Sequence, residues 1–220
     1  TQRLLRENQD RVARCERQME TLQQHRLAGY VVSLHERFSS EILEEDHLDQ
    51  SIDQELEGAP WLSPFLPSSP QAVSSFTATF VTGLVLDDVV LDIGCGDGRV
   101  LVAVAKVLGC RGIGVDVSQQ ACVKSAREMS GAEGVSDLLT FHCADATRPE
   151  AFEELGLAAA TVVFLYVYPT LLARLETLLM RLRRGGARVF TVQYHVSGEA
   201  WEASAACSDE PSTRLYPSIP

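Results

Sequence analysis

Residues 89–100 read Val-Val-Leu-Asp-Ile-Gly-Cys-Gly-Asp-Gly-Arg-Val and carry the strongest structural signal in the chain. An apolar run leads to Asp92, a glycine turn follows over 94–98, and a helical pattern begins at Arg99. A strand, a glycine turn and a helix start in this order are typical of the first unit of a parallel α/β sheet, which binds a nucleotide-like ligand at the carboxyl end of that strand. Glycine permits the tight turn and lets the backbone approach a ligand closely.

The spacing of the glycines separates two kinds of ligand. A dinucleotide-binding turn follows the pattern G-x-G-x-x-G, whereas here Gly98 comes one residue early and Arg99 takes the place of the third glycine. The carboxylate of Asp92, two positions before Gly94, would repel a pyrophosphate but suits a cationic ligand with an amino group. The pattern therefore disfavours a nicotinamide-dependent oxidoreductase. The alternative to a turn that binds a cationic ligand is a glycine turn without this role in some other α/β protein.

Strand-like and helix-like segments alternate after this turn. The expected strands are Val89–Ile93, Gly112–Asp116, Leu138–Cys143, Thr161–Tyr166 and Arg188–Tyr194, and the expected helices are Gln71–Thr82, Arg99–Leu108, Ser118–Met129, Pro149–Leu155 and Thr170–Leu182. A brief final hairpin is expected to end around residues 214–216. The alternation predicts an α/β fold, namely a Rossmann-like doubly wound, mostly parallel sheet with helices on both faces.

The chain divides into an N-terminal helical extension, 1–58, and an α/β domain, 59–220. Leu5, Val12 and Met19 recur every seven residues, which favours one amphipathic helix packed on its own domain over self-association, because few heptads are sustained. Residues 41–57 hold eight acids and no Lys or Arg. Such a run is typical of a solvated linker, and the alternative is a strip on which a basic partner docks.

Composition narrows the possible partners. The net charge of −11 disfavours nucleic-acid binding through a basic surface. The sequence has no apolar run of transmembrane length. The six cysteines and five histidines show no metal-ligand spacing, so no metal site is expected, and the cysteines are interpreted as reduced thiols of an intracellular protein. A cytoplasmic location is favoured, and organelle targeting stays open because the chain begins at Thr1.

Two further acids follow predicted strands at the same edge of the sheet as the glycine turn. Asp116 lies 24 residues after Asp92, close to where an acid binds ribose hydroxyls, although a helix cap or turn is the alternative. Asp145 follows the third strand and can accept from the exocyclic amine of adenine, while the Ala146 amide can donate to a ring nitrogen. A loop acid without such a role is the alternative for Asp145.

Two tyrosines follow the fourth strand, where a substrate would meet the reactive group. Tyr166 and Tyr168 could orient an amine through the phenol oxygen or the ring face, and a packing role is the alternative for both. No strong general base is visible near this strand. The predicted catalytic contribution is therefore the orientation of the substrate.

The motif D-x-G-x-G-x-G at 92–98 resembles the first motif of S-adenosylmethionine (SAM)-dependent methyltransferases with a Rossmann-like fold. Together with Pro64–Gln71, Thr161–Pro169 and Gly185–Val189, this motif resembles a small methyltransferase family that has many bacterial members. The animal members of that family include mitochondrial lysine methyltransferases of ATP synthase subunit c and of the adenine nucleotide translocase. The similarity covers residues 64–201.

The resemblance implies SAM as cofactor, a protein substrate and methyl transfer to a nitrogen, with lysine as the preferred acceptor. Cys95 stands where the family usually has Ser and Asp116 where it usually has Glu, while the N-terminal segment is polar rather than membrane-associated. Alternatives are a small-molecule or RNA methyltransferase and a SAM-binding adaptor without turnover. The expected cofactor-binding residues are Asp92, Gly94, Cys95, Gly96, Gly98, Asp116, Val117, Asp145, Ala146 and Leu165.

Overall fold

The structure is a computed structural model, and it describes residues 29–30, 33, 68–69, 76, 87–118, 123–201, 205–209 and 212–219. Gly29, Tyr30, Ser33 and Phe76 are helical. The rest of the expected extension over 1–58, its acidic strip and the remainder of the helix expected over 71–82 lie outside the described residues. Within the described part, no helix combines the length and the apolar character that crossing a membrane requires.

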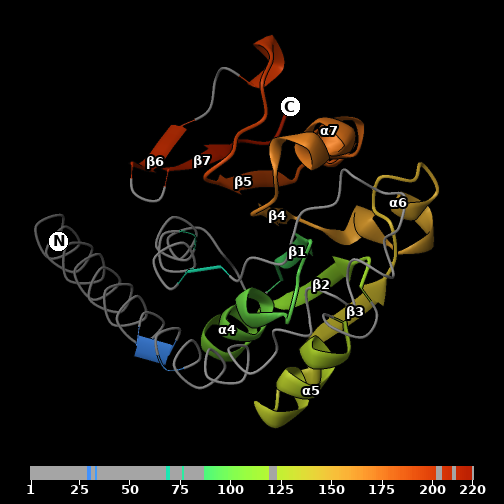
Figure 1. The fold of residues 1–220 in the computed structure, drawn as a ribbon, viewed down its shortest axis with the longest axis vertical. Helices are drawn as coiled ribbons and strands as arrows, with labels where there is room; N and C mark the ends of the chain where they lie inside the picture. Colours follow the sequence, from blue (N-terminus) through green and yellow to red (C-terminus); the bar gives the residue numbers. More distant parts are fainter. Residues whose placement is uncertain are drawn as a thin grey trace, which may run out of the picture.

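One sheet of seven strands forms the centre of the fold, in the order β3-β2-β1-β4-β5-β7-β6 (Figure 1). The first five strands run parallel and the last two pair antiparallel at one edge. The mostly parallel sheet and the final hairpin are therefore confirmed. The strands are β1 (Val89–Ile93), β2 (Arg111–Asp116), β3 (Leu139–Cys143), β4 (Val162–Leu165), β5 (Arg188–Val192), β6 (Ala205–Asp209) and β7 (Ser212–Tyr216).

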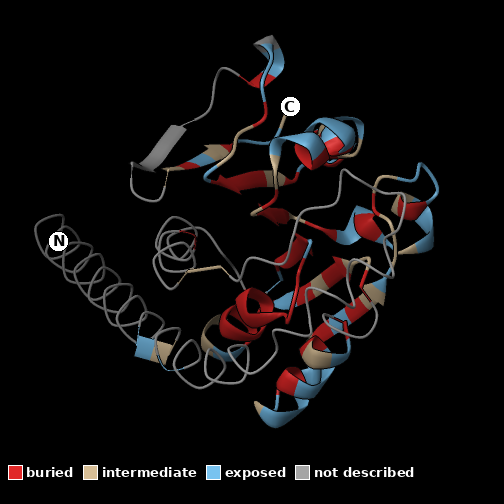
Figure 2. Cartoon of the chain, in the orientation of Figure 1, coloured by how far each residue is buried: buried red, intermediate tan, exposed pale blue. Residues whose placement is uncertain are grey.

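Helices cover both faces of the sheet, as expected for a doubly wound fold. One apolar cluster joins α4 and α5 to alternate residues of the strands, such as Val90 and Phe164, and a second joins α7 to the intervening residues, such as Leu91 and Val163. In Figure 2, α4 is almost entirely buried, whereas α5 and α7 each expose an outer face. The helices are α4 (Arg99–Leu108), α5 (Ser125–Ala132), α6 (Ala151–Glu154) and α7 (Pro169–Arg184), with 3₁₀ turns at Ser136–Leu138, Leu157–Ala159 and Glu199–Trp201.

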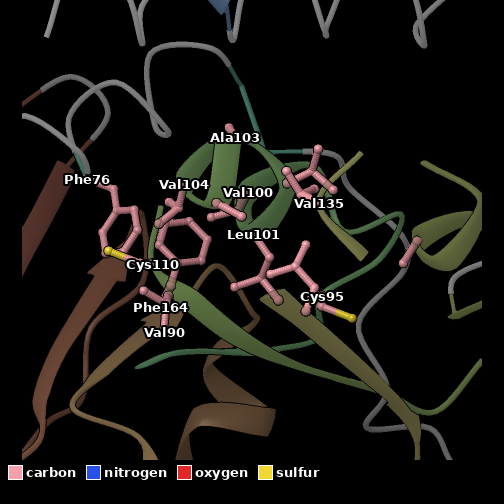
Figure 3. Close-up of a cluster of buried hydrophobic side chains, with 14 of the residues drawn as sticks. Phe76, Val90, Cys95, Val100, Leu101, Ala103, Val104, Cys110, Val135 and Phe164 are labelled. Atoms are coloured by element: carbon pink, nitrogen blue, oxygen red, sulfur yellow. The ribbon is translucent and has the colours of Figure 1, made fainter. Parts of the chain in front are cut away.

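The segment before β1 contributes to the core through Phe76. Its fully buried ring lies 4.9 Å from the ring of Phe164 and 5.2 Å from that of Phe190. Figure 3 shows Phe76 beside Phe164 and Cys110, with Cys95 toward the opposite end of the same cluster. The α/β core therefore includes chain that precedes the first strand.

Most bounds differ from the expected ones by one or two residues, and two of the differences have a clear physical reason. β5 ends at Val192 rather than Tyr194, because the backbone at Gln193 enters the left-handed region with φ 64°. The helix expected from Ser118 gives α-helix from Ser125, and Ser118 itself donates its amide to the side chain of Asp116. Both differences fall at the carboxyl edge of the sheet.

That edge is where the strand order predicts a ligand site. β1 lies between β2 and β4, so the helices that follow β1 and β4 diverge to opposite faces of the sheet. Ligands of open α/β sheets bind outside the carboxyl ends of the strands at such a switch point.

Candidate active site

The glycine turn after β1 folds back over β2. The amides of Gly94 and Cys95 both donate to the carbonyl of Val115, at 2.8 and 3.2 Å. Gly94 has φ 77°, and a Cβ there would lie 3.0 Å from Cγ1 of Val167, in the segment that follows β4. The conformation and the close contact both disfavour a side chain at Gly94, and the turn lies directly against the segment that carries the two tyrosines.

Gly98 allows the start of α4 to approach two neighbouring elements. Its φ is 77°, and a Cβ would lie 2.9 Å from that of Ala126 in α5 and 3.0 Å from the ring of Phe141 in β3. Cys95 is buried beneath the same turn. The third glycine of the motif therefore serves packing as well as turn geometry.

Asp116 joins the glycine turn to the end of β2. One carboxylate oxygen accepts the Gly96 amide at 3.0 Å, and the other accepts the Ser118 amide at 3.0 Å. The structure thus brings together two of the residues expected to bind the cofactor. A carboxylate has about four acceptor positions, and it is the kind of group that accepts from the hydroxyls of a ribose.

Asp92 lies in β1 just before the glycine turn, and only 2% of its surface is exposed. Burial, followed by the nearby carboxylates of Asp116 and Asp97, raises the pKa of Asp92 well above its ordinary value. A buried acid among other acids favours a cationic ligand, since a positive charge would stabilise its ionised form.

Asp97 and Arg99 form a buried pair at the start of α4 that sequence reasoning did not single out. The Asp97 carboxylate accepts the backbone amide of Arg99 at 3.2 Å and forms an ion pair with its guanidinium at 2.5 Å. A carboxylate therefore occupies the helix start, where a dinucleotide-binding turn would place pyrophosphate. This geometry supports the argument from glycine spacing.

The end of β3 lies beside the end of β2. The amide of Ala144 donates to the backbone carbonyl of Asp116 at 2.9 Å. The next residue, Asp145, uses its Oδ1 to accept from the amide and the hydroxyl of Thr147, at 2.8 and 2.7 Å. Asp145 thus shapes its own loop next to Asp116, and buried Ala146 follows it.

The segment after β4 carries an aromatic cluster. Tyr166 is half-buried and its hydroxyl donates to the side-chain carbonyl of Gln193 at 2.9 Å. Tyr168, at the start of α7, stacks on Tyr194 with ring centroids 5.3 Å apart. Burial, then the proximity of Tyr194 and Tyr168, raises the pKa of Tyr166.

The remaining expected residues lie at the same edge of the sheet. Leu165 is buried at the end of β4. Val117 is half-buried after β2, and its carbonyl accepts from the thiol of Cys143 at 3.4 Å. Gln193 and Tyr194 were missed as site residues, because the sequence alone predicts that β5 continues through them.

These residues fit SAM better than a dinucleotide. The buried acid Asp92 suits the amino group of its methionine part, and the acid at the end of β2 suits a ribose. The tyrosines that follow β4 flank Val167, which lies against the glycine turn, so the aromatic cluster is at the same edge of the sheet as the turn.

Comparisons with known proteins agree with this geometry. A sequence profile of the ANTKMT methyltransferase domain matches residues 92–204. A protein-lysine N-methyltransferase of Saccharolobus islandicus (strain REY15A) is 23% identical over 138 residues, which make up 61% of this chain and 79% of that protein.

Among solved structures, an RNA methyltransferase from Salinibacter ruber in complex with S-adenosyl-L-homocysteine (SAH) is 25% identical, with a TM-score of 0.58. The match covers 70% of this chain and 97% of that chain. Since the family profile spans more than half of the chain and the fold agrees, this chain belongs to the ANTKMT methyltransferase domain family and is a SAM-dependent methyltransferase.

Proposed function

We propose that this methyltransferase transfers the methyl group of SAM to the side-chain amine of a protein lysine. The observation that carries the proposal is the cluster of Tyr166, Tyr168 and Tyr194 beside Val167, the residue that contacts the glycine turn, because this cluster offers ring faces and a phenol oxygen to an amine. The family assignment and the similar protein-lysine N-methyltransferase support the same acceptor.

The cofactor is held, in this proposal, by the carboxyl ends of β1, β2 and β3. Asp92 binds the amino group directly or through water, Asp116 accepts from the ribose hydroxyls, and Asp145 with the Ala146 amide binds the adenine. Bound there, SAM supplies a methyl group that is already activated by the positive sulfur. The turn residues and their neighbours complete the contact, namely Gly94, Cys95, Gly96, Gly98, Val117 and Leu165.

The acceptor amine must arrive without its extra proton. Removal of the lysine side chain from water lowers its pKa, because burial disfavours its charged form. His195, after β5, has one ring nitrogen 2.8 Å from the hydroxyl of Thr191 and the other 2.8 Å from that of Ser212, so it is not placed as a general base. The new N–C bond forms as the C–S bond breaks to leave SAH, and the proton goes to solvent.

In this proposal the chain consists of an N-terminal helical extension, 1–58, and a methyltransferase domain, 59–220. The hydroxyl of Tyr30 donates to the Glu133 carboxylate at 2.6 Å, and Lys106 of α4 donates to the Glu133 carbonyl at 2.7 Å. The contact of Tyr30 favours an N-terminal helix that packs on its own domain over one that dimerises. The acidic strip at 41–57 is proposed to be a linker or a docking site for a basic partner. The cytoplasm is proposed as the compartment in which the protein acts.

RNA is the second candidate acceptor, because the similar Salinibacter ruber protein is an RNA methyltransferase. Charge argues against it here. The chain carries a net charge of −11. A chain with this charge would repel a phosphate backbone rather than attract it.

The test is transfer of radiolabelled methyl from SAM to a cell extract, divided into protease-treated and nuclease-treated samples. Label that resists nuclease, is released by protease and co-migrates with methyl-lysine after acid hydrolysis is expected. Nuclease-sensitive label would replace lysine by RNA. Absence of label with intact SAH binding would favour an adaptor. Arg184→Met changes an exposed residue outside the proposed site, so as a control it should transfer label as the wild type does.

A further inference from the structure

The ends of β4 and β5 bring Tyr166 and Gln193 into contact. The two strands pair in parallel with Leu165 opposite Thr191, so the residues that follow them leave the sheet at the same edge. Just beyond this pair, the hydroxyl of Tyr166, one residue after Leu165, donates to Oε1 of Gln193, two residues after Thr191, at 2.9 Å. Because Val167 lies against the glycine turn at Gly94, this hydrogen bond lies next to the proposed position of the methyl donor.

Gln193 adopts a backbone conformation that disfavours its own side chain. Its φ is 64°, and it is the one non-glycine residue with positive φ in the described ranges. Two short hydrogen bonds fix the bend, from the Gln193 amide to Ser212 and from the Tyr194 amide to Val192, each at 2.7 Å. Glycine would adopt this conformation without steric cost.

Core packing does not account for the glutamine side chain, since the residue is exposed. Its contact is with the Tyr166 hydroxyl. Non-glycine residues in the left-handed region gather at functional sites, where the surrounding structure holds them in place. The position therefore calls for an explanation in terms of function.

The hydrogen bond sets what the phenol oxygen can offer to a substrate. A phenol has one proton to donate and lone pairs to accept with. The raised pKa of Tyr166, caused by burial and then by its neighbouring tyrosines, keeps that proton in place. Since Gln193 accepts it, the oxygen has only lone pairs for a further partner.

An attacking amine needs a hydrogen-bond acceptor beside it rather than a donor. Its lone pair must point at the methyl carbon, so the enzyme has to hold the amine through its N–H groups. A phenol that donated to the amine nitrogen would occupy the lone pair that attacks. Phenol lone pairs can instead accept from the N–H groups and leave the nitrogen lone pair available.

We propose that Gln193 is a positioning residue for methyl transfer, which takes the hydroxyl proton of Tyr166 so that the phenol oxygen accepts from an N–H of the acceptor amine. The inference rests on the proposed function, in which the acceptor is an amine. The stacked rings of Tyr168 and Tyr194 are close enough to Tyr166 to raise the pKa of its hydroxyl, and they offer apolar surface to the aliphatic part of the acceptor side chain.

The test uses two defined ligands and no acceptor. SAH lacks the methyl group, whereas sinefungin carries an amine-bearing carbon in place of the methylated sulfur and so presents N–H donors toward the acceptor position. Calorimetry gives the dissociation constant of each. The wild type is expected to prefer sinefungin by roughly tenfold, the size of one charge-assisted hydrogen bond.

Four variants resolve the role of Gln193. Gln193→Gly removes the side chain and Gln193→Asn shortens it, and both residues suit a positive φ, so both should keep the melting temperature and the SAH affinity yet lose most of the preference. Gln193→Glu keeps an acceptor at the same reach and should retain the preference. Tyr166→Phe should lose it, with no further loss when combined with Gln193→Gly.

Three results would overturn the inference. One is a sinefungin preference that survives Gln193→Gly, and another is a wild type that binds SAH without preferring sinefungin. The third is a Gln193→Gly protein that melts earlier and loses both ligands alike, which would show a structural role. Because no acceptor is present, these failures are distinct from a failure of the lysine assignment, which the radiolabelling reports.

Discussion

The backbone amide of Gly96 donates a 3.0 Å hydrogen bond to the side chain of Asp116. It connects the glycine turn after β1 to the end of β2, and the Ser118 amide binds the other oxygen of the same carboxylate. One side chain thus fixes the turn and presents an acidic group at the edge where the cofactor is proposed to bind. Loss of its charge should affect both properties.

Asp116→Asn is expected to lower the affinity for SAH by about 10- to 100-fold. An amide can accept only one of the two backbone donors and turns an NH₂ group toward the other, and hydrogen bonds to a charged group contribute roughly 1.5–3 kcal/mol. Calorimetric titration measures the change. The exposed Asp137→Asn is the matched control, and full SAH affinity in the Asp116 variant would contradict the ribose assignment.

SAM binding is expected to release a proton from Asp92. Burial and the carboxylates of Asp116 and Asp97 raise the pKa of this group, and a bound cationic amino group would lower it again. Affinity for SAM should therefore rise as pH rises through the pKa of Asp92 in the ligand-free protein. Calorimetry in two buffers with different ionisation enthalpies counts the protons released.

Asp92→Asn removes the group that is expected to release the proton, so it is the control for that experiment. The substitution should also alter the stability of the fold. In the unfolded chain Asp92 ionises near pH 3.8, whereas the ligand-free folded chain holds the proton to higher pH. The free energy of unfolding of the wild type therefore falls as pH rises between these two pKa values. The Asp92→Asn variant should lack this fall of the free energy of unfolding with pH, and it should melt at a higher temperature at neutral pH and lose SAM binding. If it bound SAM with the same proton release as the wild type, the released proton would not come from Asp92.

Gly98→Ala is expected to destabilise the fold more than Gly156→Ala does. Both glycines have positive φ, 77° and 65°, but a Cβ at Gly98 would meet Ala126 at 2.9 Å, whereas at Gly156 nothing lies within 4 Å. Backbone strain alone costs about 1–2 kcal/mol, and the clash should add about 1–3 kcal/mol at Gly98. Urea denaturation gives both values, and equal losses would show that α4 and α5 separate at little cost.

Arg183→Met should lower the free energy of unfolding by about 1.5–3 kcal/mol, since it removes hydrogen bonds from a buried charged donor. Arg183 is buried, donates to the carbonyls of Ala200 and Pro217 at 3.1 and 2.9 Å, and lies 4.5 Å from the Trp201 ring. The exposed neighbour provides the control, because Arg184→Met should stay within about 0.5 kcal/mol of the wild type. Similar losses in the two variants would contradict a specific role in anchoring the C-terminal segment.

The elements that local chemistry determines could be predicted from the sequence. The bounds expected for β1 and α4 are confirmed, because Gly94 and Gly98 end one element and start the next through their own backbone conformations. The parallel order of the sheet followed from the alternation of strands and helices. β2 begins one residue earlier than expected, at Arg111, because it pairs there with Val89.

The part of the site that depends on contacts between distant segments could not be predicted. Gln193 reads as the continuation of an apolar strand, and its left-handed bend depends on a hydrogen bond to Ser212 in β7. Its contact with Tyr166 joins residues 27 positions apart. Asp97 and Arg99 are close in sequence, yet their pairing at the helix start depends on the burial that the fold creates.

The most direct test of the account is calorimetric titration of the purified chain with SAM, beside the same titration with NADH. The account predicts micromolar binding of SAM and no binding of NADH, because buried acids occupy the turn and the helix start where a pyrophosphate would lie. Binding of NADH, or a folded protein that does not bind SAM, would contradict it.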